Sequence, residues 1–154
     1  MKPHLPIIVL AAGQSSRMRG TDKLLEQVDG MPLIRRQAMM ARRVTTGPVI
    51  VALPSPPHPR FAALDGLDVT CLPVPDATEG MNASLRTAFG ALPNNTRAAM
   101  LVLGDLPDLT DSDLNTVAQS VDIKSDTLIW RGMTQAGAPG HPIVFSATLF
   151  PRFA

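Results

Sequence analysis

The order of apolar and amphipathic segments predicts an α/β fold with a mainly parallel sheet and helices on both faces. Short apolar runs alternate with helical patterns, and a loop of small residues directly follows the first run. The predicted strands are short and aliphatic, as strands buried on both faces are. They span residues 7–11, 49–53, 69–72, 99–103 and 127–130.

Three segments between these strands carry helical signals. Pro32 can occupy a first helical turn ahead of residues 33–44, because its fixed φ suits that position. Thr110 and Asp113 form a capping arrangement for a later helix. Asn82 is expected to cap a helix whose apolar residues recur with helical spacing, namely Leu85, Ala88, Phe89 and Leu92.

Length, charge and composition restrict the classes of function. A chain of 154 residues can form one domain with a substantial core. A formal charge of +1 and few aromatic residues give no reason to propose a nucleic acid or an anionic membrane as partner. The N-terminus lacks a signal-peptide pattern, and the single cysteine, Cys71, excludes an intrachain disulfide. We therefore expect a cytoplasmic location.

The loop at residues 10–23, reading LAAGQSSRMRGTDK, has the composition of a polyphosphate site. Small residues let the backbone approach an anion and direct N–H groups toward it. Arg17 and Lys23 supply the positive charge that a triphosphate requires. The spacing of Gly13 and Gly20 fits neither a Walker loop nor a dinucleotide-binding fingerprint. An ordinary turn between a strand and a helix is the alternative interpretation.

Polar groups in residues 74–85 are expected at the same edge of the sheet, because ligands bind beyond the carboxyl ends of parallel strands. Gly80 permits close approach to a ligand, and a helix N-terminus presents free N–H groups. The hydrogen-bonding side chains are those of Asp76, Thr78, Asn82 and Ser84. The alternative is an ordinary loop with an asparagine cap.

Asp105 follows the fourth predicted strand, in the sequence Gly104-Asp-Leu-Pro107. A carboxylate in this position can hold Mg²⁺, which prefers oxygen ligands and bridges phosphates. Gly104 is expected to leave room for the ligand. Alternatively, Asp105 caps a turn. His141, between a glycine and a proline, could contact a phosphate or be an ordinary turn residue.

Four segments in the same order resemble the MobA-like nucleotidyltransferases. The loop at residues 10–23 resembles the signature L-A-[AG]-G-x-S-x-R-M-x-G-x-D-K. Residues 79–85 resemble the EGM-x-x-SL segment, and residues 104–107 resemble G-D-[MQ]-P with a leucine at the third position. The LAAG form and the PGHP at residues 139–142 are closer to the molybdenum cofactor cytidylyltransferase (MocA-like) branch. The resemblance implies a Rossmann-like, three-layer α/β/α fold of the nucleotide-diphospho-sugar transferase type.

The resemblance also implies an activity and its participants. CMP would pass from CTP to the molybdenum-molybdopterin cofactor, with release of pyrophosphate. Arg17, Lys23 and Asp105 would be catalytic, with Asp105 holding Mg²⁺, while His141 would face the pterin. A molybdenum hydroxylase or its maturation chaperone would be a further partner. The implied nucleotide contacts are Leu10, Ala11, Ala12, Gly13, Ser15, Ser16, Arg17, Lys23, Asp76, Gly80, Ser84 and Asp105.

Two other functions stay open at this point. One is a related nucleotidyltransferase that uses GTP or another acceptor, and the other is a nucleotide-binding protein with impaired catalysis. The second follows from the end of the chain at residues 150–154, because the proteins it resembles continue into a segment that commonly contains G-D-x-G-A-R. We therefore expect residues 1–154 to form a single MobA-like domain, truncated at its C-terminus.

Overall fold

Six strands form a central sheet in the computed structural model, which describes residues 2–13, 22–133, 137 and 139–154. The first four strands in sheet order are parallel to one another, and the last two are antiparallel to their neighbours. The mainly parallel sheet expected from the sequence is therefore confirmed. In sheet order the strands are β5 (Thr70–Val74), β4 (Val49–Pro54), β1 (Ile7–Leu10), β6 (Ala98–Leu103), β8 (Pro139–Ser146) and β7 (Ile129–Met133).

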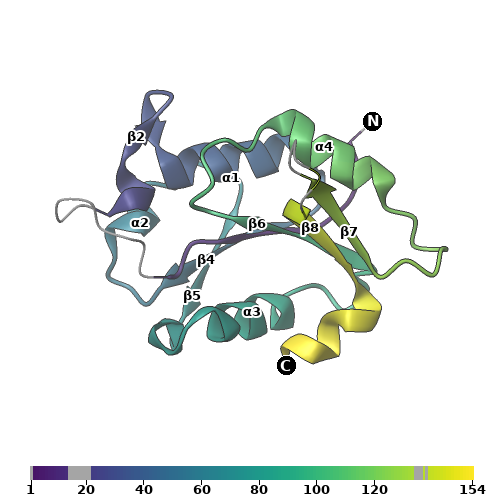
Figure 1. Cartoon of the computed structure of the whole chain (residues 1–154). Coiled ribbons are helices and arrows are strands. Elements are labelled where there is room, and N and C mark those ends of the chain that lie inside the picture. The colour runs from purple at the N-terminus through teal and green to yellow at the C-terminus, as the bar shows by residue number, and fades with distance from the viewer. Residues whose placement is uncertain (1, 14–21, 134–136, 138) are drawn as a thin grey trace.

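Helices cover both faces of this sheet (Figure 1). Ile7 and Val9 of β1 pack in the core on one face, and Ile8 and Leu10 pack in the core on the other. Because successive strand residues point to opposite faces, a strand covered on both sides must be apolar throughout. One face carries α1 (Leu33–Val44) and α4 (Asp111–Ser120), and the other carries α3 (Met81–Gly90) and the 3₁₀ segment η3 (Ala147–Phe153).

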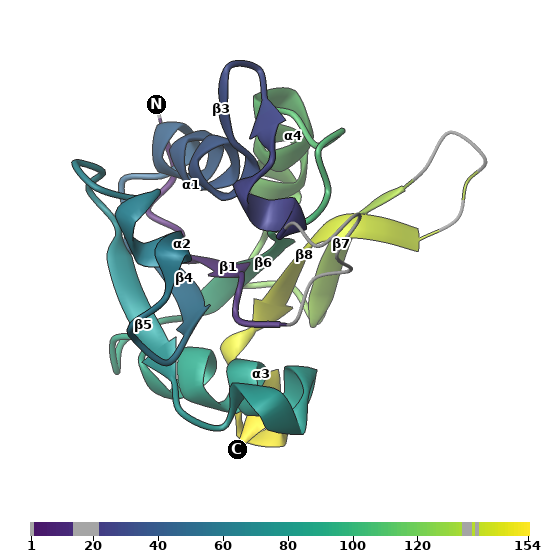
Figure 2. The ribbon, with the colours of Figure 1, turned by 90° about the vertical axis from the view of Figure 1, so that its left-hand side faces the viewer.

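Short elements lie near the carboxyl ends of the parallel strands. Figure 2, which views this edge, shows α2 beside β4. Two short strands pair as an antiparallel hairpin ahead of α1. The short elements are η1 (Lys23–Leu25), β2 (Gln27–Val28), β3 (Met31–Pro32), α2 (Pro59–Ala62) and η2 (Ala77–Glu79).

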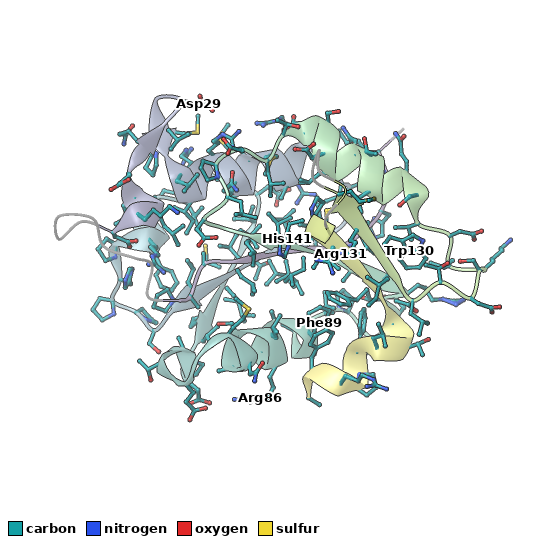
Figure 3. The ribbon with its side chains drawn as sticks, viewed as in Figure 1. Asp29, Arg86, Phe89, Trp130, Arg131 and His141 are labelled. Carbon is teal, nitrogen blue, oxygen red and sulfur yellow. The ribbon has the colours of Figure 1, made fainter. Side chains whose placement is uncertain are left out.

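An aromatic cluster joins η3 to the underside of the sheet. Phe89 of α3, labelled in Figure 3, stacks on Phe153 with 4.1 Å between ring centroids. Phe145 of β8 and Phe150 complete the cluster, with centroids 6.1 and 5.2 Å from that of Phe89. Phe89 is buried and the other three rings are partly buried, and aromatic pairs of this kind add to the area term of the hydrophobic effect. The C-terminal residues are therefore packed against the core.

The helix boundaries confirm part of the sequence analysis and correct part of it. The capping box predicted at the start of α4 is present, with the Oγ1 of Thr110 accepting from Asp113 N at 3.2 Å and Asp113 Oδ2 accepting from Thr110 N at 2.9 Å. The prediction that Asn82 caps α3 is wrong, because Gly80 occupies the cap position. No helix in the described part of the chain is long and apolar enough to cross a membrane.

Strand β8 is the main element that the sequence analysis did not predict. It begins with a Pro-Gly-His-Pro run, which is typical of a turn. Its pairing with β6 and β7 places it in the sheet nevertheless, with Ile143 opposite Leu101. The predicted strand at residues 127–130 is shifted, since β7 covers Ile129–Met133.

Candidate functional site

A cavity of about 430 Å³ lies where β1 and β6 end and α3 begins. This is the edge of the sheet that faces the viewer in Figure 2. Residues from three of the predicted segments meet here, although they are far apart in sequence. The cavity is lined by Leu10, Ala11, Ala12, Gly13, Leu24, Ala77, Thr78, Gly80, Met81, Ser84, Leu103 and Asp105. Seven of the predicted nucleotide contacts are among them: Leu10, Ala11, Ala12, Gly13, Gly80, Ser84 and Asp105.

Gly104 allows the ends of β1 and β6 to touch. Its N–H donates to the carbonyl oxygen of Leu10 at 2.9 Å, and a Cβ on Gly104 would lie only 2.7 Å from that oxygen. We expected Gly104 to leave room for a ligand. Its missing side chain instead leaves room for the Leu10 carbonyl, and this contact brings Asp105 beside the loop that follows β1.

Buried groups of α1 hold the turn that carries Asp105. Gln37 is fully buried, and its Nε2 donates to the carbonyl oxygen of Leu106 at 2.9 Å. Arg36 donates through Nη1 to the Oε1 of Gln37 at 2.6 Å and through Nη2 to the Leu109 carbonyl at 2.9 Å. Neither residue was expected at the site from the sequence, because an arginine-rich helix face is typical of solvent-exposed surface. The side chain of Arg36 is only 17% exposed.

The start of α3 forms the opposite side of the cavity. Gly80 has a φ of 110°, a conformation that favours glycine, and it immediately precedes the helix. Ser84 is 4% exposed and faces the cavity from the next turn. The N-terminal end of a helix attracts negative charge because of its free N–H groups and its dipole.

Several predicted site residues lie elsewhere. Lys23 is half-buried in η1, and it is its neighbour Leu24 that lines the cavity. The carboxylate of Asp76 is exposed and lies 3.6 Å from Nη2 of Arg86. The roles of Lys23 and Asp76 stay predictions. Ser15, Ser16 and Arg17 lie outside the residues that the structure describes.

His141 lies in β8, so the interpretation of this residue as part of a turn is wrong. Its Nδ1 is buried, and no described residue hydrogen-bonds to it. Burial lowers the pKa of His141, the charge of Arg131 lowers it further, and the nearby carboxylate of Asp105 acts in the opposite direction. Figure 3 shows His141 and Arg131 next to each other. His141 is therefore close to Asp105 without lining the cavity, and its contact with a substrate stays a prediction.

A second hollow, of about 630 Å³, adjoins this cavity and shares Ala12, Gly13, Ala77 and Thr78 with it. Asp22 and Arg60 also line it. No role was expected for either residue from the sequence. Asp22 belongs to the first motif, whereas Arg60 follows a proline-rich loop and carries no local signal.

Among the residues that the structure describes, Asp105 is the one acidic residue that lines the cavity. No group of three or more His, Cys, Asp or Glu side chains that could hold a metal occurs in the described part of the chain. Mg²⁺ is commonly held by one or two carboxylates together with substrate phosphates. A single exposed carboxylate therefore fits a divalent cation that binds together with a nucleotide.

The comparisons with known proteins agree with this geometry. The model of the MobA-like NTP transferase domain matches residues 7–154. The bifunctional protein GlmU of Leifsonia xyli is 34% identical over 108 residues, covering 68% of this chain and 22% of GlmU. A probable molybdenum cofactor guanylyltransferase of Natronomonas pharaonis is 32% identical over 117 residues, covering 75% of this chain and 56% of that protein.

The crystal structure of Rv0371c from Mycobacterium tuberculosis superposes with a TM-score of 0.81 at 27% identity, covering 100% of this chain and 77% of that one. A complex of Rv0371c with manganese matches with a TM-score of 0.79 at 25% identity, covering 98% of this chain and 75% of that one. The chain spans 22–56% of the length of the curated relatives that it matches. The sequence match and the fold together place this chain in the family of MobA-like NTP transferase domains.

Proposed function

We propose that this protein is a nucleotidyltransferase that joins the α-phosphate of a nucleoside triphosphate to an acceptor phosphate and releases pyrophosphate. The observation that carries the proposal is the convergence of residues 10–13, of Gly80, Met81 and Ser84, and of Asp105 on one cavity of about 430 Å³. Small residues, a helix N-terminus and a carboxylate are the groups that a metal-bound polyphosphate requires.

The residues of the chain position the reactants and stabilise charge. The backbone at Ala11–Gly13 would hold the base and phosphates, and the start of α3 would favour the negative charge beside Gly80. Arg17 and Lys23 would bind the triphosphate. Asp105 would hold Mg²⁺ or Mn²⁺, which neutralises phosphate oxygens when it is bound. No nucleophilic side chain is required, because the attacking oxygen belongs to the acceptor.

For the substrates, we propose CTP and the molybdenum-molybdopterin cofactor. The LAAG form at residues 10–13 supports CTP, since it resembles the cytidylyltransferase branch. GTP is the second candidate, and it is favoured by the name of the Natronomonas relative, a probable molybdenum cofactor guanylyltransferase.

The test begins with thermal unfolding of the full chain in CTP, GTP, ATP or UTP, each with Mg²⁺ or Mn²⁺. A ligand that binds only the folded state raises stability by RT ln(1 + [L]/Kd), so the preferred nucleotide gives the largest shift. CTP should stabilise most, and pyrophosphate should appear when the molybdopterin cofactor is added.

A larger rise in unfolding temperature with GTP than with CTP would indicate that GTP is the donor. Stabilisation without pyrophosphate release would favour a nucleotide-binding protein with impaired catalysis. A chain that no nucleotide stabilises would contradict the proposed function.

A further inference from the structure

One buried guanidinium holds both ends of the segment that follows β1. Arg60 of α2 is 3% exposed, and its Nη1 donates to the carbonyl oxygens of Ala11 at 2.7 Å and Gly13 at 2.8 Å. Its Nε and Nη2 donate to Oδ2 and Oδ1 of Asp22 at 2.8 and 3.0 Å. Gly13 precedes residues 14–21 and Asp22 follows them, so the two ends meet at the same side chain.

This arrangement requires an arginine. The guanidinium is planar and has five N–H donors in a fixed fork, whereas the ammonium of lysine is a single point of charge. At Arg60, Nη1 faces the backbone carbonyls while Nε and Nη2 form a two-pronged contact with Asp22. A lysine could not make both contacts from one position.

Further hydrogen bonds hold the residues on either side of the ion pair. The Oδ1 of Asp22 also accepts from Leu24 N at 3.0 Å, which starts η1. The N–H of Arg60 donates to Nδ1 of His58 at 3.2 Å, which starts α2. A buried charge is costly without its partner, so the pair resists separation. The contact therefore ties η1 and α2 to the end of β1.

The carbonyls that Arg60 holds belong to the candidate site. Ala11 and Gly13 both line the cavity of about 430 Å³. Because a peptide unit is planar, fixing the carbonyl of Ala11 also fixes the direction of the N–H of Ala12, another lining residue. Arg60 itself lines the adjoining hollow and does not line this cavity.

We propose that Arg60, together with Asp22, is a positioning residue for the nucleotide. It holds the backbone of Ala11 and Gly13 in the conformation that binds the nucleotide, without contacting the nucleotide. This inference rests on the proposed function. A preformed binding loop gains affinity because it loses little freedom when the ligand binds, so loosening the contact should weaken nucleotide binding more than it weakens the fold.

The test compares this buried ion pair with a more exposed pair of the same two-pronged geometry elsewhere. Arg43 of α1 and Asp111 of α4 also form a two-pronged contact, at 2.7 and 2.9 Å. The variants are Arg60→Lys and Asp22→Asn, and the controls are Arg43→Lys and Asp111→Asn. For each full-length variant, calorimetry measures the Kd for CTP and GTP with Mg²⁺, and the unfolding temperature is measured without nucleotide.

We expect Arg60→Lys and Asp22→Asn to raise the Kd by about ten- to a hundredfold, the order of loss that follows from a misplaced binding group. The controls should keep the Kd within about twofold. Asp22→Asn preserves the shape of the side chain, so it carries the test if Arg60→Lys does not fold. An unchanged Kd in Asp22→Asn, with a lowered unfolding temperature, would show that the pair is only structural and would overturn the inference.

The outcome for the unmodified chain separates the two proposals. If it binds a nucleotide and the variants at positions 22 and 60 bind equally well, the positioning role fails and the proposed function stands. If the unmodified chain binds none of the nucleotides, both fail.

Discussion

The two ends of the parallel strands both carry a hollow, and the larger one is not at the candidate site. At the amino ends of β1, β4 and β6 lies a cavity of about 1020 Å³, whereas the carboxyl ends carry the candidate cavity of about 430 Å³ and the adjoining hollow of about 630 Å³. Basic side chains dominate the charge around the larger cavity, which is lined by His4, Arg42, Arg97, Asp122 and Lys124 among others.

The two ends differ in how their polar groups are used. At the amino end, Thr45 donates to the Leu5 carbonyl at 2.6 Å, and Arg42 donates to the carbonyls of Thr45 and Gly47 at 2.8 and 2.7 Å. At the carboxyl end, the carboxylate of Asp105 is exposed and makes no hydrogen bond to any described residue. The polar groups named at the amino end are engaged within the fold, whereas the carboxylate of Asp105 at the carboxyl end remains available to a ligand. Cavity volume alone therefore does not identify the candidate site.

The largest expected effect comes from exchanging one aspartate at each end for asparagine. Asp105→Asn should lower pyrophosphate release by about a hundredfold or more, because it removes the carboxylate that would hold the metal. Asp122→Asn, at the larger cavity, should leave turnover unchanged. The measurement is the rate of pyrophosphate release under saturating nucleotide and metal. Equal rates of pyrophosphate release for the two variants would contradict the assignment of the reaction to the carboxyl ends of the strands.

A glycine at each end allows a similar comparison. A Cβ on Gly104 would lie 2.7 Å from the oxygen of Leu10, and one on Gly47 would lie 3.1 Å from the carbonyl carbon of Leu5. Gly104→Ala should cost about 1–3 kcal/mol of stability, as overpacking does, and should also raise the Kd for nucleotide. Gly47→Ala should cost less and should not change the Kd. Denaturant unfolding and nucleotide titration together measure both effects.

Buried polar side chains at the two ends give a third contrast. Gln37→Leu removes the side-chain donor to the Leu106 carbonyl, which keeps only a longer bond from Leu109 N at 3.3 Å, and Thr45→Val removes the donor to the Leu5 carbonyl. Each should lower the free energy of unfolding by about 1–3 kcal/mol. Only Gln37→Leu should also raise the nucleotide concentration needed for half-maximal turnover, because Gln37 holds the turn that carries Asp105. If both variants need the same nucleotide concentration for half-maximal turnover, the turn that carries Asp105 does not affect nucleotide binding.

The smallest effect is expected away from both ends, at Arg43 and Asp111. The hydrogen bond from Arg43 lowers the pKa of Asp111, with burial acting in the opposite direction. Since the folded-state pKa lies below the unfolded value of about 3.9, the contribution is complete above that pH and is lost as the pH falls through the folded-state pKa. Asp111 is 42% exposed, so the loss should stay below about 1 kcal/mol.

Unfolding curves between about pH 2 and pH 6 would measure this effect. In Asp111→Asn, the free energy of unfolding should fall slightly less steeply as the pH is lowered, and nucleotide binding should be unchanged. A large acid-dependent change in nucleotide binding in this variant would contradict its use as a neutral control.

The sequence by itself determined the fold class and the place of the candidate site. Apolar runs such as residues 7–10 are continuous because both faces of a parallel sheet are covered, so the strands could be found locally. Parallel strands end at one edge, and this is why the loops after β5 and β6, which carry Gly80 and Asp105, could be expected to meet the loop after β1. The capping box at Thr110 could also be predicted from the sequence, since its two partners lie three residues apart.

Only the tertiary structure decided which side chains hold that site together. Arg60 lies 49 residues from Ala11 in sequence, and Gln37 lies 69 residues from Leu106. Strand β8 begins with residues typical of a turn and is a strand because β6 and β7 supply its hydrogen bonds. Local patterns report periodicity and capping, which depend on near neighbours. A buried polar contact depends on where distant backbone carbonyls lie after packing, and no local pattern specifies their position.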